Sequence, residues 1–97
     1  MDTREQIMAT LQRLKPEIQA RYKVTQISVF GSTIRDEHTD SSDIDILVDF
    51  REDADLFDWT ELALYLEDQT GRKIDLVPRK ALRPELRQAV LAEAVAL

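Results

Sequence analysis

The chain has 97 residues, of which 43% are apolar and 33% charged, so residues 1–97 have the length and composition of one folded domain. It lacks cysteine, begins with polar residues and contains no apolar run near the roughly 18 residues that span a membrane, so we expect a cytoplasmic protein without disulfides, signal peptide or membrane contact. The net charge of −6 argues against direct nucleic-acid binding, which needs a basic surface.

Helices are expected at the start of the chain. Apolar residues at helical spacing predict a helix over 3–14, with Asp2 and Glu5 forming a capping-box-like start. Pro16 is expected to end this helix and to open a second short helix that runs to about Tyr22.

Two strands and a polar loop follow. Residues 24–30 are rich in Val, Ile, Thr and Phe, which is typical of a strand. Residues 36–42 are polar and predict a loop. Residues 43–50 alternate apolar and acidic side chains, which predicts a second strand with one polar face.

The remaining elements complete a small α/β fold. Helical spacing predicts a helix over 55–69, with Gly71 at its C-terminal cap. A short strand is expected over 73–77 and a last helix over 84–96. The order of elements predicts an α/β (α+β) domain with a small, mixed, three-stranded sheet flanked by helices.

Two sequence features are candidates for a ligand site. Gly31-Ser32 directly follows a strand, where a glycine allows close approach of a ligand and the next turn can point N–H groups at a triphosphate, although a lone Gly-Ser is more often a simple turn. Asp43 and Asp45 lie on one face of a strand, about 6.5–7 Å apart, where they would repel unless exposed, protonated or bridged by a cation such as Mg²⁺. Taken alone, an Asp-x-Asp pair is more often the polar face of an edge strand.

Asp75 is a third candidate, because it interrupts a short apolar strand and is costly to bury unless it is paired or metal-bound. An ion pair with a nearby Lys or Arg is the alternative. If its strand neighbours the second one, three carboxylates lie beside a phosphate-binding turn, which is the layout of two-metal phosphoryl or nucleotidyl transfer.

These residues carry a family resemblance. Gly31-Ser32, ten residues and then Asp43-Ile44-Asp45 resemble the signature of the DNA polymerase β-like nucleotidyltransferases. Motif, size and element order together are similar to the minimal nucleotidyltransferases (MNT), which are encoded beside HEPN proteins. The fold this resemblance implies is the polymerase β palm-like fold of that family.

The resemblance also implies roles for single residues. Asp43 and Asp45 would hold two Mg²⁺ ions, and Asp75 would bind the catalytic ion and accept the proton of the attacking hydroxyl. Gly31-Ser32 would contact the nucleotide phosphates, with Arg35 as a further phosphate contact or a structural one. Thr33, Ile34 and Asp36 depart from the aromatic, Ala and Gly common in the family; Asp36 would need a left-handed backbone.

The activity implied by the resemblance is transfer of AMP from ATP to a hydroxyl of a partner protein, with the chain acting as the antitoxin of a HEPN toxin ribonuclease in a hetero-oligomer. Because the chain is short, we expect the partner to supply the acceptor. Two alternatives stay open: a non-catalytic antitoxin that silences its partner by contact, and a nucleotidyltransferase acting on a small molecule such as an antibiotic.

Other chemically capable residues have ordinary interpretations. His38 is expected to be a solvated loop residue, and Trp59 and Tyr65 to be part of the core. Basic residues near the third strand are expected to form a solvated edge, with contact to phosphates or to the partner as the alternative: Arg72, Lys73, Arg79 and Lys80.

Overall fold

The structure is a computed structural model that describes residues 2–97. Helices, short 3-10 turns (η) and strands alternate along the chain. In chain order they are α1 (Arg4–Tyr22), β1 (Val24–Phe30), η1 (Gly31–Thr33), β2 (Ile44–Phe50), α2 (Leu56–Thr70), β3 (Ile74–Pro78), η2 (Arg79–Ala81), α3 (Pro84–Glu93) and β4 (Val95–Ala96).

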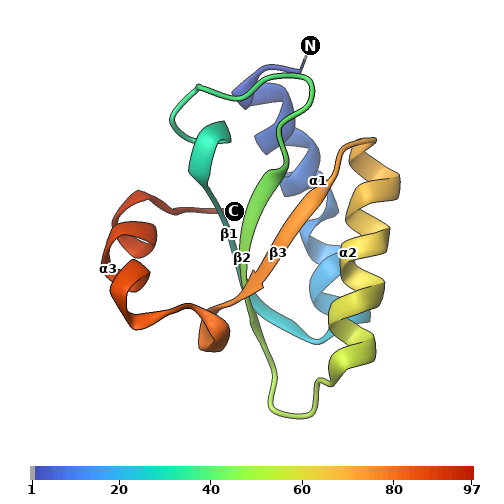
Figure 1. Ribbon diagram of the computed structural model, residues 1–97. Helices are drawn as coiled ribbons and strands as arrows, with labels where there is room; N and C mark the ends of the chain where they lie inside the picture. Colours follow the sequence, from blue (N-terminus) through green and yellow to red (C-terminus); the bar gives the residue numbers. More distant parts are fainter. Residues whose placement is uncertain (1) are drawn as a thin grey trace.

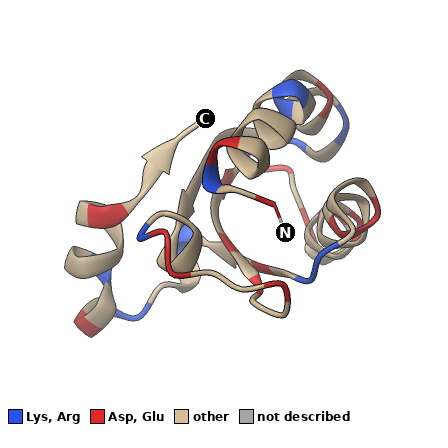
Figure 2. Cartoon of the chain, turned by 90° about the horizontal axis from the view of Figure 1, so that it is seen from above, with Lys and Arg blue, Asp and Glu red and all other residues tan. Residues whose placement is uncertain are grey.

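The sheet is mixed and has the strand order β3-β2-β1-β4. Strand β1 pairs antiparallel with both β2 and β4, whereas β2 and β3 run parallel and are joined through α2. Helices α1 and α2 lie together on one face of the sheet, and α3 lies on the other side of the molecule (Figures 1 and 2). The expected α/β class is therefore confirmed.

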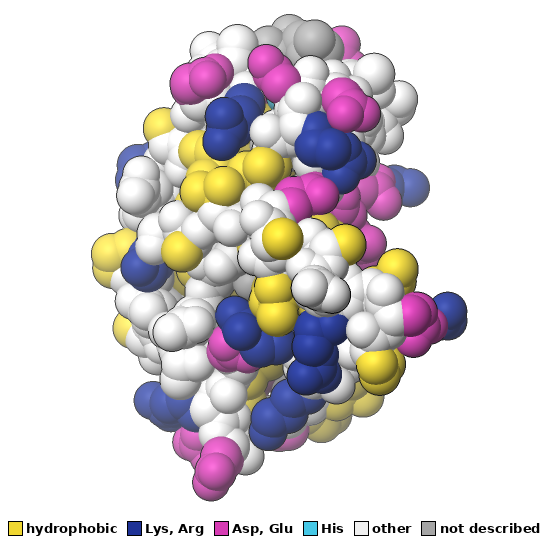
Figure 3. Space-filling model, turned by 90° about the vertical axis from the view of Figure 1, so that its left-hand side faces the viewer, with side chains coloured by type: hydrophobic (Ala, Val, Ile, Leu, Met, Phe, Trp, Pro, Cys, Tyr) yellow, Lys and Arg dark blue, Asp and Glu magenta, His cyan; other side chains and the backbone are white. Residues whose placement is uncertain are grey.

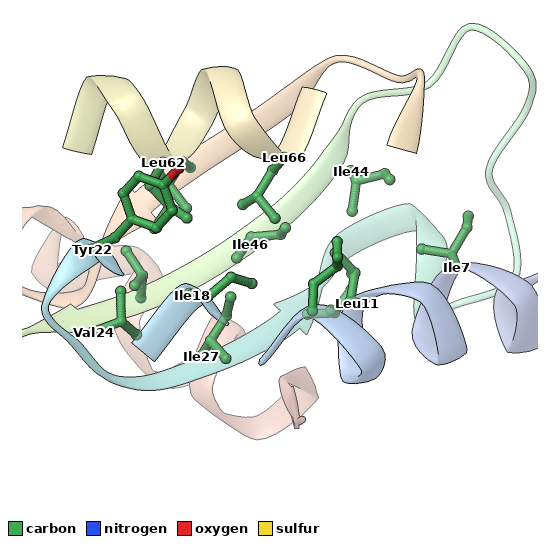
Figure 4. Packing of buried hydrophobic residues seen from close by; sticks show 14 residues of the cluster. Ile7, Leu11, Ile18, Tyr22, Val24, Ile27, Ile44, Ile46, Leu62 and Leu66 are labelled. Carbon is green, nitrogen blue, oxygen red and sulfur yellow. The ribbon is translucent and has the colours of Figure 1, made fainter. Parts of the chain in front are cut away.

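The core lies between the sheet and the α1–α2 layer (Figure 4). Alternate residues of β2 point into it, because successive strand side chains face opposite ways. Ile44 and Ile46 are fully buried there against Leu62 and Leu66 of α2. The face bearing the acidic residues of β2 is thus turned away from the core.

Helix α1 is continuous from Arg4 to Tyr22, so the expectation of two helices broken at Pro16 is wrong. A proline inside a helix costs about 3 kcal/mol, because it removes a hydrogen bond and crowds the preceding turn. Pro16 is exposed, and Leu14 and Ile18 on either side of it are buried. Burial of one such side chain contributes about 1.5–3 kcal/mol, so packing carries the helix through the proline.

The chain end also differs from expectation. The helix predicted to reach residue 96 ends at Glu93, and residues 95–96 pair with Ser28 and Val29 at the free edge of β1. The sheet therefore has four strands instead of the predicted three. Pairing with an open strand edge satisfies backbone groups that the helix would otherwise have satisfied internally.

Helix ends follow the expected chemistry with small shifts. The N-cap of α1 is Thr3, which forms a capping box with Gln6, instead of the expected Asp2. Asp55 caps α2, and Gly71 ends that helix in the left-handed conformation, as predicted. None of the helices in the described chain has both the length and the apolar character needed to cross a bilayer.

Candidate functional site

Gly31 begins the turn that follows β1, and any larger residue there would have a strained backbone and would displace the Asp45 side chain. Its φ is +76°, and a Cβ atom built on it would lie 2.0 Å from Oδ2 of Asp45. The carbonyl of Gly31 accepts hydrogen bonds from the N–H groups of Ile34 and Arg35, both at 3.1 Å, which close the turn. The glycine therefore allows the backbone to contact the Asp45 carboxylate directly.

Asp45 and Asp75 are neighbours across the parallel pair of β2 and β3. The register places Asp45 opposite Asp75, so both side chains lie on the sheet face that is turned away from the core. Asp45 is half-buried and Asp75 is exposed. The structure thus brings together two of the three predicted carboxylates and sets the Gly31 turn against one of them.

Electrostatics at this pair disfavours two negative charges. Burial, and then the neighbouring Asp75 and Asp43 carboxylates, raise the pKa of Asp45 from its ordinary 3.8 to about 6, and the Arg35 charge lowers it slightly. Like charges on adjacent strands are destabilising. A bound cation would relieve this repulsion.

The residues present fit a divalent ion that prefers oxygen ligands. Asp43, Asp45 and Asp75 offer only carboxylate oxygens, the hard donors that Mg²⁺ uses together with substrate phosphates. Within the described residues, no three Asp, Glu, His or Cys side chains are already gathered into a metal-binding group. Of the three candidate ligands, Asp45 and Asp75 lie side by side. Asp43 lies two residues before Asp45 at an exposed position.

Arg72 holds the loop that leads to Asp43. Its Nη2 donates to the carbonyl oxygens of Thr39 at 2.6 Å and Ser42 at 2.9 Å. Thr39 and Ser42 also bond to each other, since the Thr39 N–H donates to the Ser42 hydroxyl at 2.8 Å. The expectation that Arg72 belongs to a solvated edge is therefore wrong: it fixes the backbone immediately before Asp43.

Arg35 lies beside the Gly31 turn, but its guanidinium already has acidic partners. Its Nη1 lies 2.7 Å from Oε1 of Glu93, and its Nε lies 3.3 Å from Glu37. The same Glu93 oxygen accepts the N–H of Gly31. Glu93 was not among the predicted site residues, because no motif links it to a turn 62 residues earlier.

Ser32 and Asp36 complete this segment. Ser32 is half-buried within η1, and its carbonyl accepts the N–H of Glu37 at 2.9 Å. Asp36 has a φ of 60°, which is the left-handed conformation expected where the family often has glycine. The departure from the family pattern therefore leaves the turn intact.

Part of the face that carries α3 is basic. Lys and Arg side chains gather in the lower half of this face (Figure 3). Segment η2 contains Arg79 and Lys80, helix α3 contains Arg87, and Arg83 is the N-cap residue of α3. Of these, Arg79 pairs with Asp49 at 3.0 Å, on the same side of β2 as Asp45. A basic field beside the carboxylates favours an anionic ligand.

Of the expectations for His38, Trp59 and Tyr65, the first is wrong and the other two are confirmed. His38 is buried instead of solvated, with its Nε2 2.7 Å from the carbonyl oxygen of Asp2, so it has a structural place in the loop. Trp59 and Tyr65 pack against the core, as predicted. The indole N–H of Trp59 donates to the carbonyl of Leu76 at 2.9 Å, which ties α2 to β3.

Known proteins resemble this chain over nearly its whole length. The profile of the family described as "Nucleotidyltransferase domain" matches residues 11–97. Protein adenylyltransferase MntA of Thermococcus cleftensis is 42% identical over 95 residues, covering 98% of this chain and 96% of that protein. A solved structure described as a candidate minimal nucleotidyltransferase has a TM-score of 0.87 and 36% identity, covering 99% of this chain and 97% of that one. A crystal structure described as a toxin-antitoxin with AMP-PNP has a TM-score of 0.73 and 25% identity, covering 88% and 70%.

Proposed function

Because the chain belongs to the nucleotidyltransferase domain family and is a nucleotidyltransferase, we propose that it transfers AMP from ATP to a hydroxyl group of a partner protein. The observation that carries this proposal is the pairing of Asp45 with Asp75 on the open face of the sheet, in contact with the Gly31 turn. Carboxylates beside a phosphate-binding turn are what nucleotidyl transfer requires.

In this proposal each residue has a defined task. Asp43, Asp45 and Asp75 bind two Mg²⁺ ions, which when bound neutralise charge on the phosphates and on the leaving pyrophosphate. Gly31-Ser32 and Arg35 hold the triphosphate by backbone and side-chain donors. The proposal needs Asp43 to turn toward the other two carboxylates, which its exposed position permits.

Asp75 is the proposed proton acceptor. It is the more exposed member of the carboxylate pair, so an acceptor hydroxyl can approach it from solvent. The hydroxyl gives its proton to Asp75 as its oxygen attacks the α-phosphorus. The bond to the β-phosphate oxygen breaks, and pyrophosphate leaves.

The proposed acceptor is a HEPN-type toxin, with this chain acting as its antitoxin in a hetero-oligomer. Two comparisons support a protein acceptor and a toxin partner. The relative at 42% identity is named a protein adenylyltransferase, and a structural neighbour is described as a toxin-antitoxin with AMP-PNP. The AMP-PNP also supports ATP as the nucleotide.

The test is label transfer. The purified protein is incubated with α-labelled ATP, MgCl₂ and the HEPN-type protein encoded beside it, and the products are separated by electrophoresis. We expect label on the partner that disappears with EDTA and with Asp43→Ala or Asp75→Asn. Asp49→Ala, a carboxylate of the same strand that pairs with Arg79, is the matched control and should retain labelling.

Absence of label, together with tight partner binding by both the wild type and Asp43→Ala, would refute the transfer reaction and favour a contact-only antitoxin. Label on a small molecule in place of the partner would favour the small-molecule alternative. Both outcomes can be read from the same reaction.

A further inference from the structure

The last residue of α3 reaches back to the turn proposed to bind the nucleotide. The Glu93 carboxylate uses one oxygen, Oε1, to accept both the N–H of Gly31 and the Nη1 of Arg35. The side chain of Glu93 is only 26% exposed, so this is an inward-pointing contact. A carboxylate oxygen thus lies between two donors that an oxygen of a phosphate group would also seek.

The contact also removes the positive charge that would attract a phosphate. Arg35 pairs with Glu93 at 2.7 Å and with Glu37 at 3.3 Å, so two negative groups surround one guanidinium. The Gly31 N–H can donate one good hydrogen bond, and Glu93 takes it. A triphosphate that binds these donors must therefore replace the carboxylate.

Helix α3 is weakly packed along its own length, and its C-terminal end is anchored by the pairing of β4 with β1. Of the residues of α3, all of which the structure describes, none is buried. Leu86 is 50% exposed and Leu91 37% exposed, so little apolar surface holds the helix to the rest of the domain. Figures 1 and 2 show α3 apart from the α1–α2 layer that closes the core.

We propose that Glu93 is a built-in competitor of the nucleotide: its carboxylate occupies the Gly31 and Arg35 donors when no nucleotide is bound, and the triphosphate displaces this carboxylate and loosens the last turn of α3, while β4 stays paired with β1. This inference rests on the proposed function, because it assigns those donors to phosphate. It adds a residue that lowers nucleotide affinity and couples occupancy of the turn to the position of α3.

The test compares Glu93→Gln with Glu85→Gln. Both remove one negative charge from α3, but Glu85 lies exposed in the first turn of the helix. The dissociation constants of ATP with MgCl₂ and of inorganic tripolyphosphate are measured by calorimetry. We expect Glu93→Gln to bind both ligands about tenfold more tightly, the scale of one charge-assisted hydrogen bond, and Glu85→Gln to match the wild type.

A second measurement uses the wild type alone. Tripolyphosphate should accelerate amide hydrogen exchange in the last turn of α3 and leave exchange in α1 unchanged. Weaker or unchanged affinity in a folded Glu93→Gln variant, or no change in exchange at α3 under saturating ligand, would overturn the proposal in favour of Glu93 as a brace of the turn.

The outcomes are separable from those of the proposed function. If Glu93→Gln gains tripolyphosphate affinity but no partner is labelled, the competitor role stands and AMP transfer fails. If the partner is labelled but Glu93→Gln changes neither affinity nor exchange, transfer stands and the competitor role fails. If neither the wild type nor Glu93→Gln binds ATP or tripolyphosphate, the competitor role is refuted, and the labelling assay decides whether AMP is transferred.

Discussion

Replacing Asp45 by asparagine should stabilise the protein at neutral pH while abolishing its activity. The Asp45 carboxylate lies opposite Asp75 and against the Gly31 turn, and its pKa is raised to about 6 by burial and by the Asp75 and Asp43 charges. A raised pKa in an acid means that ionisation is less favourable in the folded than in the unfolded state. The ionised wild type therefore carries a penalty that a neutral asparagine side chain at the same position avoids.

The size of the penalty follows from the pKa of Asp45. The difference between about 6 and 3.8 corresponds to about 3 kcal/mol, at about 1.36 kcal/mol per pKa unit. Asp45 is partly exposed, and solvent screening reduces this to roughly 1–2 kcal/mol. In a domain of this size that difference raises Tm by about 5–10 °C.

The pH dependence has a definite sign. Below about pH 3.8 Asp45 is protonated in both states and carries no penalty, so Asp45→Asn should have little effect. As pH rises from 3.8 through about 6, the unfolded state ionises first and the wild type loses stability relative to the variant. The full difference is expected above about pH 7.

The assay is thermal unfolding by circular dichroism in EDTA, from about pH 3.5 to about pH 8, for the wild type, Asp45→Asn and Asp49→Asn. Asp49 is on the same strand but is paired with Arg79, so its replacement should give no gain. Millimolar MgCl₂ should stabilise the wild type and not Asp45→Asn. An Asp45→Asn variant that is no more stable than the wild type at about pH 7.5, or a gain that persists unchanged at about pH 3.5, would refute the reasoning.

Three further predictions concern the backbone around the site and the first helix. Gly31→Ala should lower Tm and reduce AMP transfer at least a hundredfold, because its Cβ would collide with Asp45. The control Gly71→Ala has nothing within 4 Å of its added Cβ, so it should cost only about 1 kcal/mol of left-handed backbone strain. Equal losses of stability and transfer in both variants would contradict this prediction. Arg72→Ala should release the loop before Asp43 and slow AMP transfer about tenfold or more. Lys73→Ala, which removes an equal charge from an exposed position, is the control. Unchanged transfer kinetics in Arg72→Ala would exclude a positioning role for Arg72. Pro16→Ala should raise the free energy of unfolding by roughly 1–3 kcal/mol in urea titrations, because it restores a helical N–H donor; a loss of stability would mean that the proline supports α1.

Short-range patterns in the sequence predicted that two of the candidate carboxylates, Asp45 and Asp75, lie side by side. The alternation in β2 assigned Asp45 to the polar face, and the single acid of β3 was placed beside it by the parallel register. The family resemblance is confirmed by the family match over residues 11–97. The placement of the two carboxylates depended on spacings of a few residues, which strand geometry fixes, whereas the resemblance also depended on chain length and element order.

Long-range contacts were beyond prediction. The contact of Glu93 with Gly31 depends on where α3 lies. Because no residue of α3 is buried, its apolar pattern could not predict that position. Arg72 was taken for a surface charge because its carbonyl partners lie 30 and 33 residues earlier. Local propensity predicts a helix end at Pro16, because it does not include the stability that burial of Leu14 and Ile18 adds to α1.

The two faces of the sheet have different surroundings. Helices α1 and α2 close one face over the apolar core, while the carboxylates, the Gly31 turn and the weakly held α3 share the other. Substitutions on the second face need not pass through the core, but they still change stability, because Asp45 is ionised there against a raised pKa and Gly31 holds a left-handed backbone. A domain divided in this way is a suitable starting point for laboratory selection of new acceptors, with the α1–α2 layer held constant.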